Sequence, residues 1–343
     1  MASDRRVLIL AEGRSADPHY GKTARGVMRY RPDDVVALLD SQRPGETEGG
    51  FPVVGTVAEA QRYAPTVALV GVATQGGRFP PAWRELLKDA IGAGLDVENG
   101  LHEFLADDPE LLALAKEHGV ELRDLRKAPL GLNVPTGANL THPAKTILTV
   151  GSDCAIGKMT VSLELDREAR RRGLRSEFVP TGQTGIAIAG WGISVDAVVS
   201  DFIAGAAEQL VLEGVERGGE VLFVEGQGSV LHPAYSGVTL GLIHGSAPHG
   251  FVLCHKAGER YVDENERFPI PPLAELAELH RRLSLLARPA DVHAIALNTR
   301  DLSDAEARRA IEETESDSGL PADDPVRFGA EKLVDALAPL LQR

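Results

Sequence analysis

Short apolar runs alternate with amphipathic segments along most of the chain. The runs rich in Val, Ile and Leu are predicted to be strands, at residues 6–11, 34–39, 66–72, 95–99, 145–150, 176–180, 220–225, 249–254 and 292–298. The segments with helical spacing are residues 81–93, 107–118, 158–173, 208–217 and 330–341. Strands that alternate with helices predict parallel sheets with Rossmann-like winding.

Residues 145–160 have the order of a phosphate-binding P-loop: an apolar strand, a loop of small residues, then Gly-Lys and a helical pattern. Backbone N–H groups of such a loop, the positive end of the helix and the lysine ammonium together bind phosphate. Five residues separate Gly151 from Gly157, where the standard motif has four, and Met159 replaces the hydroxyl residue that binds Mg²⁺. The predicted binding residues are Gly151, Ser152, Asp153, Cys154, Ala155, Ile156, Gly157, Lys158, Met159 and Thr160.

The two sets of strands predict an α/β protein with two domains. We expect a Rossmann-like parallel-sheet domain over residues 1–125 and a P-loop NTPase-like α/β domain over residues 145–343. The segment between them, residues 126–144, is irregular and contains Pro and Gly, so it is predicted to be a linker. Residues of the first domain expected near a cleft at the strand ends are Gly13, Gly71, Gln75, Asn99 and His102.

A second strong signal lies where residues 220–225 form an apolar strand that closes on Glu225 and opens into a Gly-rich turn. In P-loop proteins such an acidic residue lies across from the P-loop, where it binds a metal or orients a water or an amine. Residues 180–185 form another loop of small polar residues after the preceding strand. The predicted substrate-binding residues are Thr181, Gln183, Thr184, Gly185, Gln227, Gly228, Ser229 and His102.

Few side chains are candidates for acid–base or nucleophilic chemistry. His232 follows Glu225 by seven residues, and either side chain as a general base suits deprotonation of an amine. Cys154 is either a nucleophile near a helix N-terminus or simply a small residue that fits the loop. No histidine pairs with another His or Cys at metal-ligand spacing, so no metal site is predicted.

Composition restricts the class of partner. The 343 residues carry a net charge of −14, which disfavours extended binding to nucleic acid and requires local groups to hold an anionic ligand. No apolar run approaches the roughly 18 residues of a membrane span, so no membrane partner is expected. Two cysteines favour a reducing cytoplasm over a disulfide framework. We expect small-molecule substrates and a homo-oligomer.

The second half resembles dethiobiotin synthetase and its relatives. Their Gly-Thr-Asp-Thr-x-Val-Gly-Lys-Thr loop is similar to residues 151–158, apart from Met159, and their Val-Glu-Gly strand end is similar to residues 224–226. Their late Asn, which touches the nucleotide base, is similar to Asn298. This resemblance implies a nucleotide contact for Asn298.

The whole chain resembles a narrower group, the DUF1611 family. The resemblance rests on five separated motifs, at residues 21–24 (Gly-Lys-Thr-Ala), 100–105, 151–160, 180–185 and 225–229. It implies the activity of a D-glutamate N-acetyltransferase, with acetyl-CoA as the acyl donor. Coenzyme A carries a pyrophosphate and a 3′-phosphate, which a P-loop can hold without Mg²⁺. Such a ligand is consistent with Met159 at the position of the Mg²⁺-binding hydroxyl residue.

The resulting hypothesis places CoA phosphates on residues 151–160, with Lys158 as the charge partner. The D-glutamate amine attacks the thioester after it loses a proton to Glu225 or His232, and backbone N–H groups stabilise the oxyanion. One alternative is an ATP- and Mg-dependent ligase or kinase of the dethiobiotin synthetase type. Another is a nucleotide-sensing regulatory protein without turnover. A dehydrogenase is disfavoured because no Gly-x-Gly-x-x-Gly follows the first strand.

Overall fold

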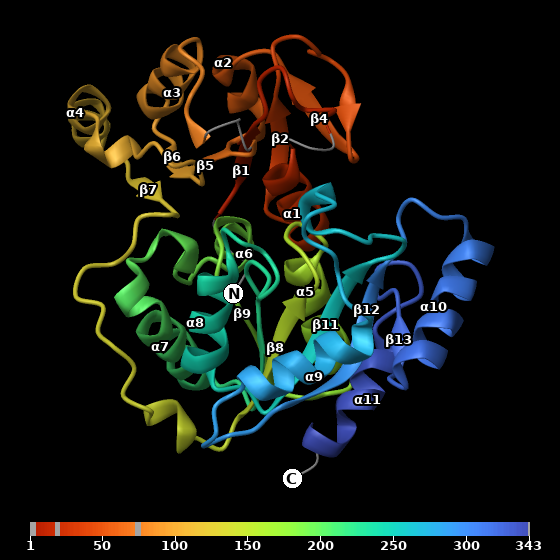
Figure 1. The fold of residues 1–343 in the computed structure, drawn as a ribbon. Helices are drawn as coiled ribbons and strands as arrows, with labels where there is room; N and C mark the ends of the chain where they lie inside the picture. Colours follow the sequence, from red (N-terminus) through yellow and green to blue (C-terminus); the bar gives the residue numbers. More distant parts are fainter. Residues whose placement is uncertain (1–4, 18–20, 73–76, 342–343) are drawn as a thin grey trace. The chain divides into compact units, whose positions relative to one another are not determined.

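A computed structural model describes residues 5–17, 21–72 and 77–341 (Figure 1). The chain divides into two compact units. The first contains residues 1–128 and 183–194, and the second contains residues 129–182 and 195–343. Gln75, which we expected near a cleft, lies outside the described residues. Among the helices that are described, none is long and apolar enough to cross a bilayer.

The first unit is built on a twisted sheet whose described strands run in the order β3-β4-β2-β1-β5-β6-β7. All neighbouring pairs are parallel except β3 with β4. Its strands are β1 (Val7–Leu10), β2 (Val35–Leu39), β3 (Thr47–Glu48), β4 (Phe51–Val54), β5 (Val67–Val70), β6 (Asp96–Asn99) and β7 (Leu122–Asp124). The central strands β1 and β5 are buried along their whole length, as expected for a sheet with helices on both faces.

Helices of the first unit cover both faces of this sheet. They are α1 (Lys22–Tyr30), α2 (Val57–Ala60), α3 (Trp83–Gly92), α4 (Pro109–His118) and α6 (Gln183–Ala189). Right-handed crossovers place α1 on one face and α2, α3 and α4 on the other. Helix α6 comes from far along the chain and packs on α1, where the hydroxyls of Thr23 and Thr184 lie 2.9 Å apart.

The second unit has a six-stranded, fully parallel sheet in the order β13-β12-β11-β8-β10-β9. Its strands are β8 (Lys145–Gly151), β9 (Ser176–Val179), β10 (Val221–Val224), β11 (Gly250–Lys256), β12 (Asp291–Asn298) and β13 (Ala322–Asp323). From β8 the chain first crosses to β9 at one edge and later returns to β11, so β8 lies where the winding reverses. Ligands of open α/β sheets bind at the carboxyl ends of the strands at this switch point.

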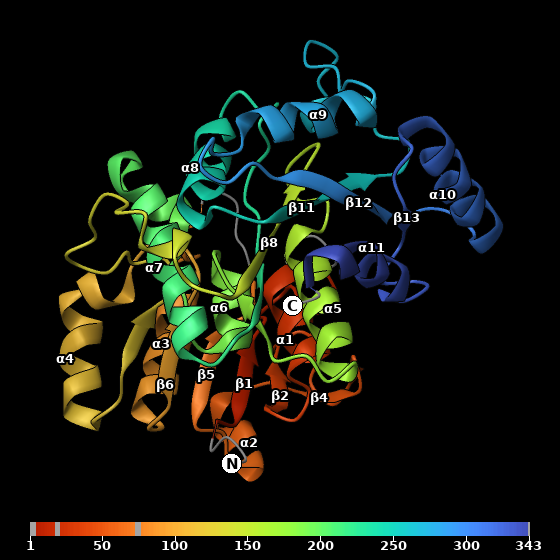
Figure 2. The ribbon, with the colours of Figure 1, turned by 90° about the horizontal axis from the view of Figure 1, so that it is seen from below.

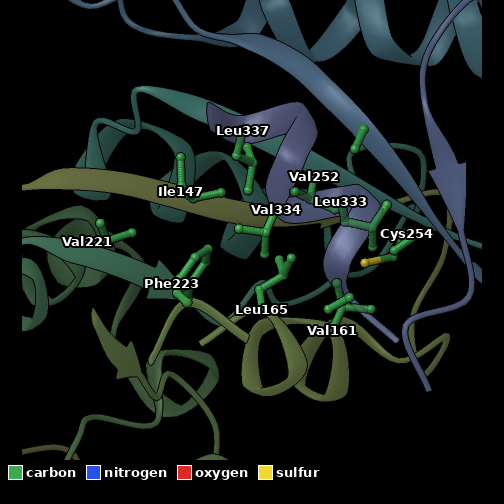
Figure 3. Close-up of a cluster of buried hydrophobic side chains, with 14 of the residues drawn as sticks. Ile147, Val161, Leu165, Val221, Phe223, Val252, Cys254, Leu333, Val334 and Leu337 are labelled. Atoms are coloured by element: carbon green, nitrogen blue, oxygen red, sulfur yellow. The ribbon is translucent and has the colours of Figure 1, made fainter. Parts of the chain in front are cut away.

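Helices α5 (Lys158–Arg171) and α11 (Glu331–Leu341) cover one face of the second sheet (Figure 2). Their apolar side chains pack on the sheet in one buried cluster, which includes Ile147, Leu165, Phe223 and Leu337 (Figure 3). The opposite side carries α7 (Ile203–Glu216), α8 (Ser236–Ser246), α9 (Leu273–Leu283) and α10 (Asp304–Ser318). This cluster fixes the first turn of α5 against the end of β8, where the P-loop lies.

The predicted α/β class is confirmed, and each predicted strand has a counterpart in one of the two sheets. Asp108 caps α4 and Gly119 ends it with φ 69°, as the sequence indicates. The prediction that residues 180–185 form a loop is wrong in part, because α6 begins at Gln183. In the Gly-Lys-Thr-Ala motif of residues 21–24, Gly21 is the N-cap of α1 and the helix begins at Lys22.

Two buried histidines make the stability of the second unit sensitive to acid. Burial lowers the pKa of His255 and of His280 to about 4. Above about pH 6.5, the pKa of histidine in the unfolded chain, both imidazoles are neutral in the folded and in the unfolded protein. Below that pH only the unfolded chain protonates them, which favours unfolding. We expect stability to fall between about pH 6.5 and pH 4, on the order of 1 kcal/mol per pH unit for each histidine.

Urea unfolding at pH 7 and pH 5 measures this loss. His280→Leu removes one of these groups, whose ring is fully buried and bonds only through Nδ1 to the Leu276 carbonyl. The variant should therefore lose less stability than the wild type between the two pH values. An equal loss in both proteins would contradict the assignment.

Candidate functional site

The P-loop connects the end of β8 to the first turn of α5. Residues 152–157 form the turn, and Ala155 and Gly157 adopt the left-handed region with φ values of 53° and 116°. Backbone that alternates in this way turns successive N–H groups toward one concavity. Because α5 begins directly at Lys158 and extends over 14 residues, its positive end faces the same loop.

Lys158 lies across this loop and is 6 % exposed. Its ammonium donates a hydrogen bond of 2.6 Å to the backbone carbonyl of Asp153. Gly151 makes room for the lysine, since a Cβ at this position would lie 3.1 Å from Nζ. The ammonium is thus held at the loop, where it can serve as the charge partner of an anion.

Side chains from three other segments fix the loop. Ser152 Oγ and His255 Nδ1 share a hydrogen bond of 2.9 Å, and the Ser229 hydroxyl donates to the Ser152 carbonyl. Asn298, at the end of β12, donates its amide to the Ile156 carbonyl at 3.1 Å. Asn298 therefore supports the loop itself, a role that its resemblance to a base-contacting Asn did not suggest.

Glu225 follows β10 and clamps the neighbouring turn. One carboxylate oxygen accepts the Thr181 and Gly182 N–H groups at 2.9 and 3.1 Å, and the other accepts the Gln227 amide at 3.2 Å. The side chain is only 4 % exposed. Thr181, Gln227 and Glu225 therefore form one connected group at the carboxyl end of the sheet.

The strand end packs directly on β8. The Gly226 N–H donates to the Thr149 hydroxyl at 3.0 Å, and a Cβ on Gly226 would lie 1.7 Å from the Thr149 carbonyl oxygen. Gly228 adopts φ 66° and turns the chain back toward α8. The glycines after Glu225 thus bring the carboxylate close to the P-loop strand.

A cluster of three reactive side chains forms where the P-loop meets the turn before α8. Asp153, Cys154 and His232 place one ligand-type atom each within 4.8 Å of one another. His232 is 8 % exposed, and its Nδ1 accepts the Ala234 N–H at 3.1 Å. Since Nδ1 accepts, the neutral ring carries its proton on Nε2. The spacing of these residues along the chain did not indicate this proximity.

A cavity of about 550 Å³ lies beside the loop, at the ends of β11 and β12. Its lining includes His255 and Leu297, and the charged residues Glu259, Arg260, Glu313 and Asp317. Burial raises the pKa of Glu259. Three carboxylates against one arginine make this cavity a poorer phosphate site than the P-loop.

The structure divides the other predicted site residues between the two units. Thr181, Gln227, Gly228 and Ser229 join the group around Glu225, whereas Gln183, Thr184 and Gly185 lie in α6 of the first unit. His102 is exposed in the first unit, and its backbone N–H donates to the Gly77 carbonyl. Met159 and Thr160 lie in the first turn of α5.

Sequence reasoning missed two residues that hold the P-loop. His255 lies at the end of β11 beside the loop, and Asp263 donates its backbone N–H to the Asp153 carboxylate at 2.6 Å. The position of His255 at the end of a predicted strand was the available signal. No signal was available for Asp263, because its contact is made by the backbone.

A lysine-bearing loop at the switch point of a parallel sheet, accompanied by a Rossmann-like unit, defines a two-domain P-loop protein. The chain belongs to the DUF1611 family. The family's C-terminal P-loop domain of unknown function matches residues 133–334, and its N-terminal Rossmann-like domain matches residues 41–128. The resemblance to this family in the sequence motifs is therefore confirmed.

Two relatives and one solved structure are similar over most of the chain. A D-glutamate N-acetyltransferase of Tritonibacter scottomollicae is 36% identical over 96% of this chain and 98% of its own. A D-glutamate N-acetyltransferase of a Pseudoalteromonas species is 34% identical over 81% and 83%. The crystal structure of a DUF1611 family protein from Anabaena variabilis has a TM-score of 0.90 and 41% identity, covering 98% of this chain and 100% of that one.

Proposed function

We propose that this protein is an acyltransferase that moves the acetyl group of acetyl-CoA to the amino group of D-glutamate. Two relatives that match most of the chain carry the name of this activity. The observation that carries the proposal is a P-loop whose helix opens with Lys158 and Met159. The loop offers a lysine and N–H donors for phosphate, but no hydroxyl at the position that normally binds Mg²⁺.

The P-loop would hold the phosphates of coenzyme A. The left-handed residues Ala155 and Gly157 open the turn, and Lys158 supplies the positive charge. An anion at the loop would compete with the Asp153 carbonyl for the Lys158 ammonium. When bound, the thioester of acetyl-CoA supplies an activated carbonyl carbon for transfer.

Glu225 is the better candidate for the base that accepts the amine proton. The hydrogen bond from Ala234 fixes the proton of neutral His232 on Nε2, so that nitrogen is a donor. Glu225 carries two acceptor oxygens at the strand end beside the P-loop. The neighbouring Thr181, Gln227 and Ser229 supply polar groups for the amino acid.

Thiol release measured with acetyl-CoA and D-glutamate tests this function. We expect release that requires D-glutamate, is not supported by L-glutamate, and continues without ATP and in the presence of a chelator, because Met159 leaves no Mg²⁺ hydroxyl. If phosphate or ADP appears with Mg-ATP and no thiol is released, the protein is instead an ATP-dependent ligase or kinase. Ligand binding without any product would identify a regulatory protein.

A further inference from the structure

The cavity at the ends of β11 and β12 has been given no role so far, although its volume of about 550 Å³ is that of a small-molecule site. All of its lining residues belong to the second unit. The lining combines apolar side chains from three segments, among them Ile270, Leu273 and Leu297, with polar ones. Such a lining suits a ligand that has apolar faces and a polar edge.

One polar group of this lining has an unmatched atom. Glu259 Oε2 is buried and accepts no hydrogen bond from the residues that the structure describes. A buried acceptor of this kind is costly, because it has given up water without gaining a donor. Burial, followed by repulsion from the Asp153 carboxylate, raises the pKa of Glu259. In either protonation state the carboxyl group still offers an acceptor oxygen, so a ligand with an N–H donor would complete it.

The cavity adjoins the P-loop. His255 lines the cavity, and its Nδ1 shares a hydrogen bond of 2.9 Å with the Ser152 hydroxyl of the loop. The charges of Asp153 and Lys158 both act on the pKa of Glu259, so its carboxyl group lies within electrostatic range of the loop. A ligand that fills both places therefore has a phosphate on the loop and an apolar group with an N–H donor beside it.

We propose that this cavity receives the adenine base of coenzyme A, whose 6-amino group donates a hydrogen bond to Glu259. This inference rests on the proposed function and adds to it the position of the nucleotide half of the donor. Strand β11 is the neighbour of β8, and β12 comes next. The cavity is thus one to two strand spacings, about 5–10 Å, from the P-loop strand, a distance that one ribose spans. The other side of β8, where β10 lies, is left for the acyl-bearing arm.

A phosphate group or an organic cation fits this cavity less well than a neutral base. The carboxylates of Glu259, Glu313 and Asp317 repel phosphate, and Arg260 in the same lining repels an ammonium ion. Adenine carries no charge at neutral pH. Its flat rings can pack on the apolar side chains while its amino group meets the buried oxygen of Glu259.

Isothermal titration calorimetry with two nucleotides tests the contact to Glu259. Adenosine 3′,5′-bisphosphate and inosine 3′,5′-bisphosphate both lack the acyl-bearing arm, and inosine has a carbonyl in place of the 6-amino group. We expect the wild type to bind the adenosine compound about 10- to 100-fold more tightly, because the carbonyl would face an acceptor. Glu259→Gln should lose most of this preference, since its amide can turn its NH₂ toward the carbonyl. Glu312→Gln, an exposed carboxylate of α10 outside the lining, should keep it.

Filling the cavity from another element tests the position of the base independently. Ala310 contributes to the lining from α10, which does not belong to the P-loop. Ala310→Phe should weaken the binding of coenzyme A by more than about tenfold, since the ring would occupy the space of the base. Inorganic pyrophosphate, which needs only the loop, should bind as in the wild type. Ala305→Phe, at an exposed position of the same helix, is the matched control and should bind both ligands normally.

The outcomes separate this inference from the proposed function. If coenzyme A binds but the wild type does not distinguish the two bisphosphates, or Ala310→Phe binds coenzyme A normally, the base lies elsewhere and the inference is wrong. If the base preference is found but no thiol is released with acetyl-CoA and D-glutamate, the cavity is correctly assigned and the proposed function fails. If coenzyme A does not bind at all, both fail.

Discussion

Replacing Glu225 by Gln is expected to lower kcat for acetyl transfer by about a hundredfold to ten-thousandfold, the usual loss when a general base is removed. The amide can keep the local structure. Its oxygen accepts the N–H groups of Thr181 and Gly182, and its NH₂ faces Gln227, whose own amide can turn to accept. The variant therefore loses the proton acceptor while the clamp on the turn remains.

Steady-state kinetics and a thermal melt measure the two consequences. The KM for acetyl-CoA and the melting temperature should change little. Glu213→Gln, which removes an exposed carboxylate paired with Arg217, is the control and should keep full activity. If the turnover of Glu225→Gln is close to that of the wild type, Glu225 is not the general base and only holds the turn at Thr181 and Gly182.

Gly226→Ala should destabilise the second unit by about 3 kcal/mol, at the upper end of overpacking costs. The added methyl would lie 1.7 Å from the Thr149 carbonyl oxygen and 3.1 Å from Lys158 Cδ. Backbone in the middle of a parallel sheet cannot move away without breaking its ladder. We therefore also expect weaker binding of CoA, because the displaced strand carries the P-loop.

Urea unfolding followed by circular dichroism measures this loss. The matched control is Gly237→Ala in α8, where nothing lies within 4 Å of the added methyl. That substitution should be neutral or stabilise by about 0.5–1 kcal/mol, since alanine is the better helix former. Equal unfolding midpoints for the two variants would show that the close packing of the end of β10 on β8 does not determine the stability of the second unit.

Local signals in the sequence were sufficient for the parts of the site that are continuous in the chain. The apolar strand before Gly151, the small-residue loop and the helix after Lys158 are all determined by neighbouring residues. The same holds for Glu225, which ends an apolar strand and precedes two glycines. These elements could be placed on one sheet edge because strands alternating with helices imply parallel pairing.

Contacts between distant segments could not be predicted in this way. The proximity of Cys154 and His232 depends on how the turn before α8 folds back, and no periodicity encodes that return. Asn298 was assigned from a resemblance, but its amide supports the Ile156 carbonyl. Gln183 and Thr184 looked like loop residues because Gly and Thr have low helix propensity, yet packing on α1 makes them helical.

Residues 183–194 belong to the first unit although they follow the start of the second in the chain. This affects how the protein folds during synthesis and how its units can be exchanged between genes. A ribosome that has released residues 1–128 has not yet supplied α6, so the first unit cannot complete its packing until part of the second has been synthesised. Domains of many proteins fold one after another during translation, but here that order is interrupted. For the same reason, neither unit can be exchanged between genes as a single uninterrupted cassette.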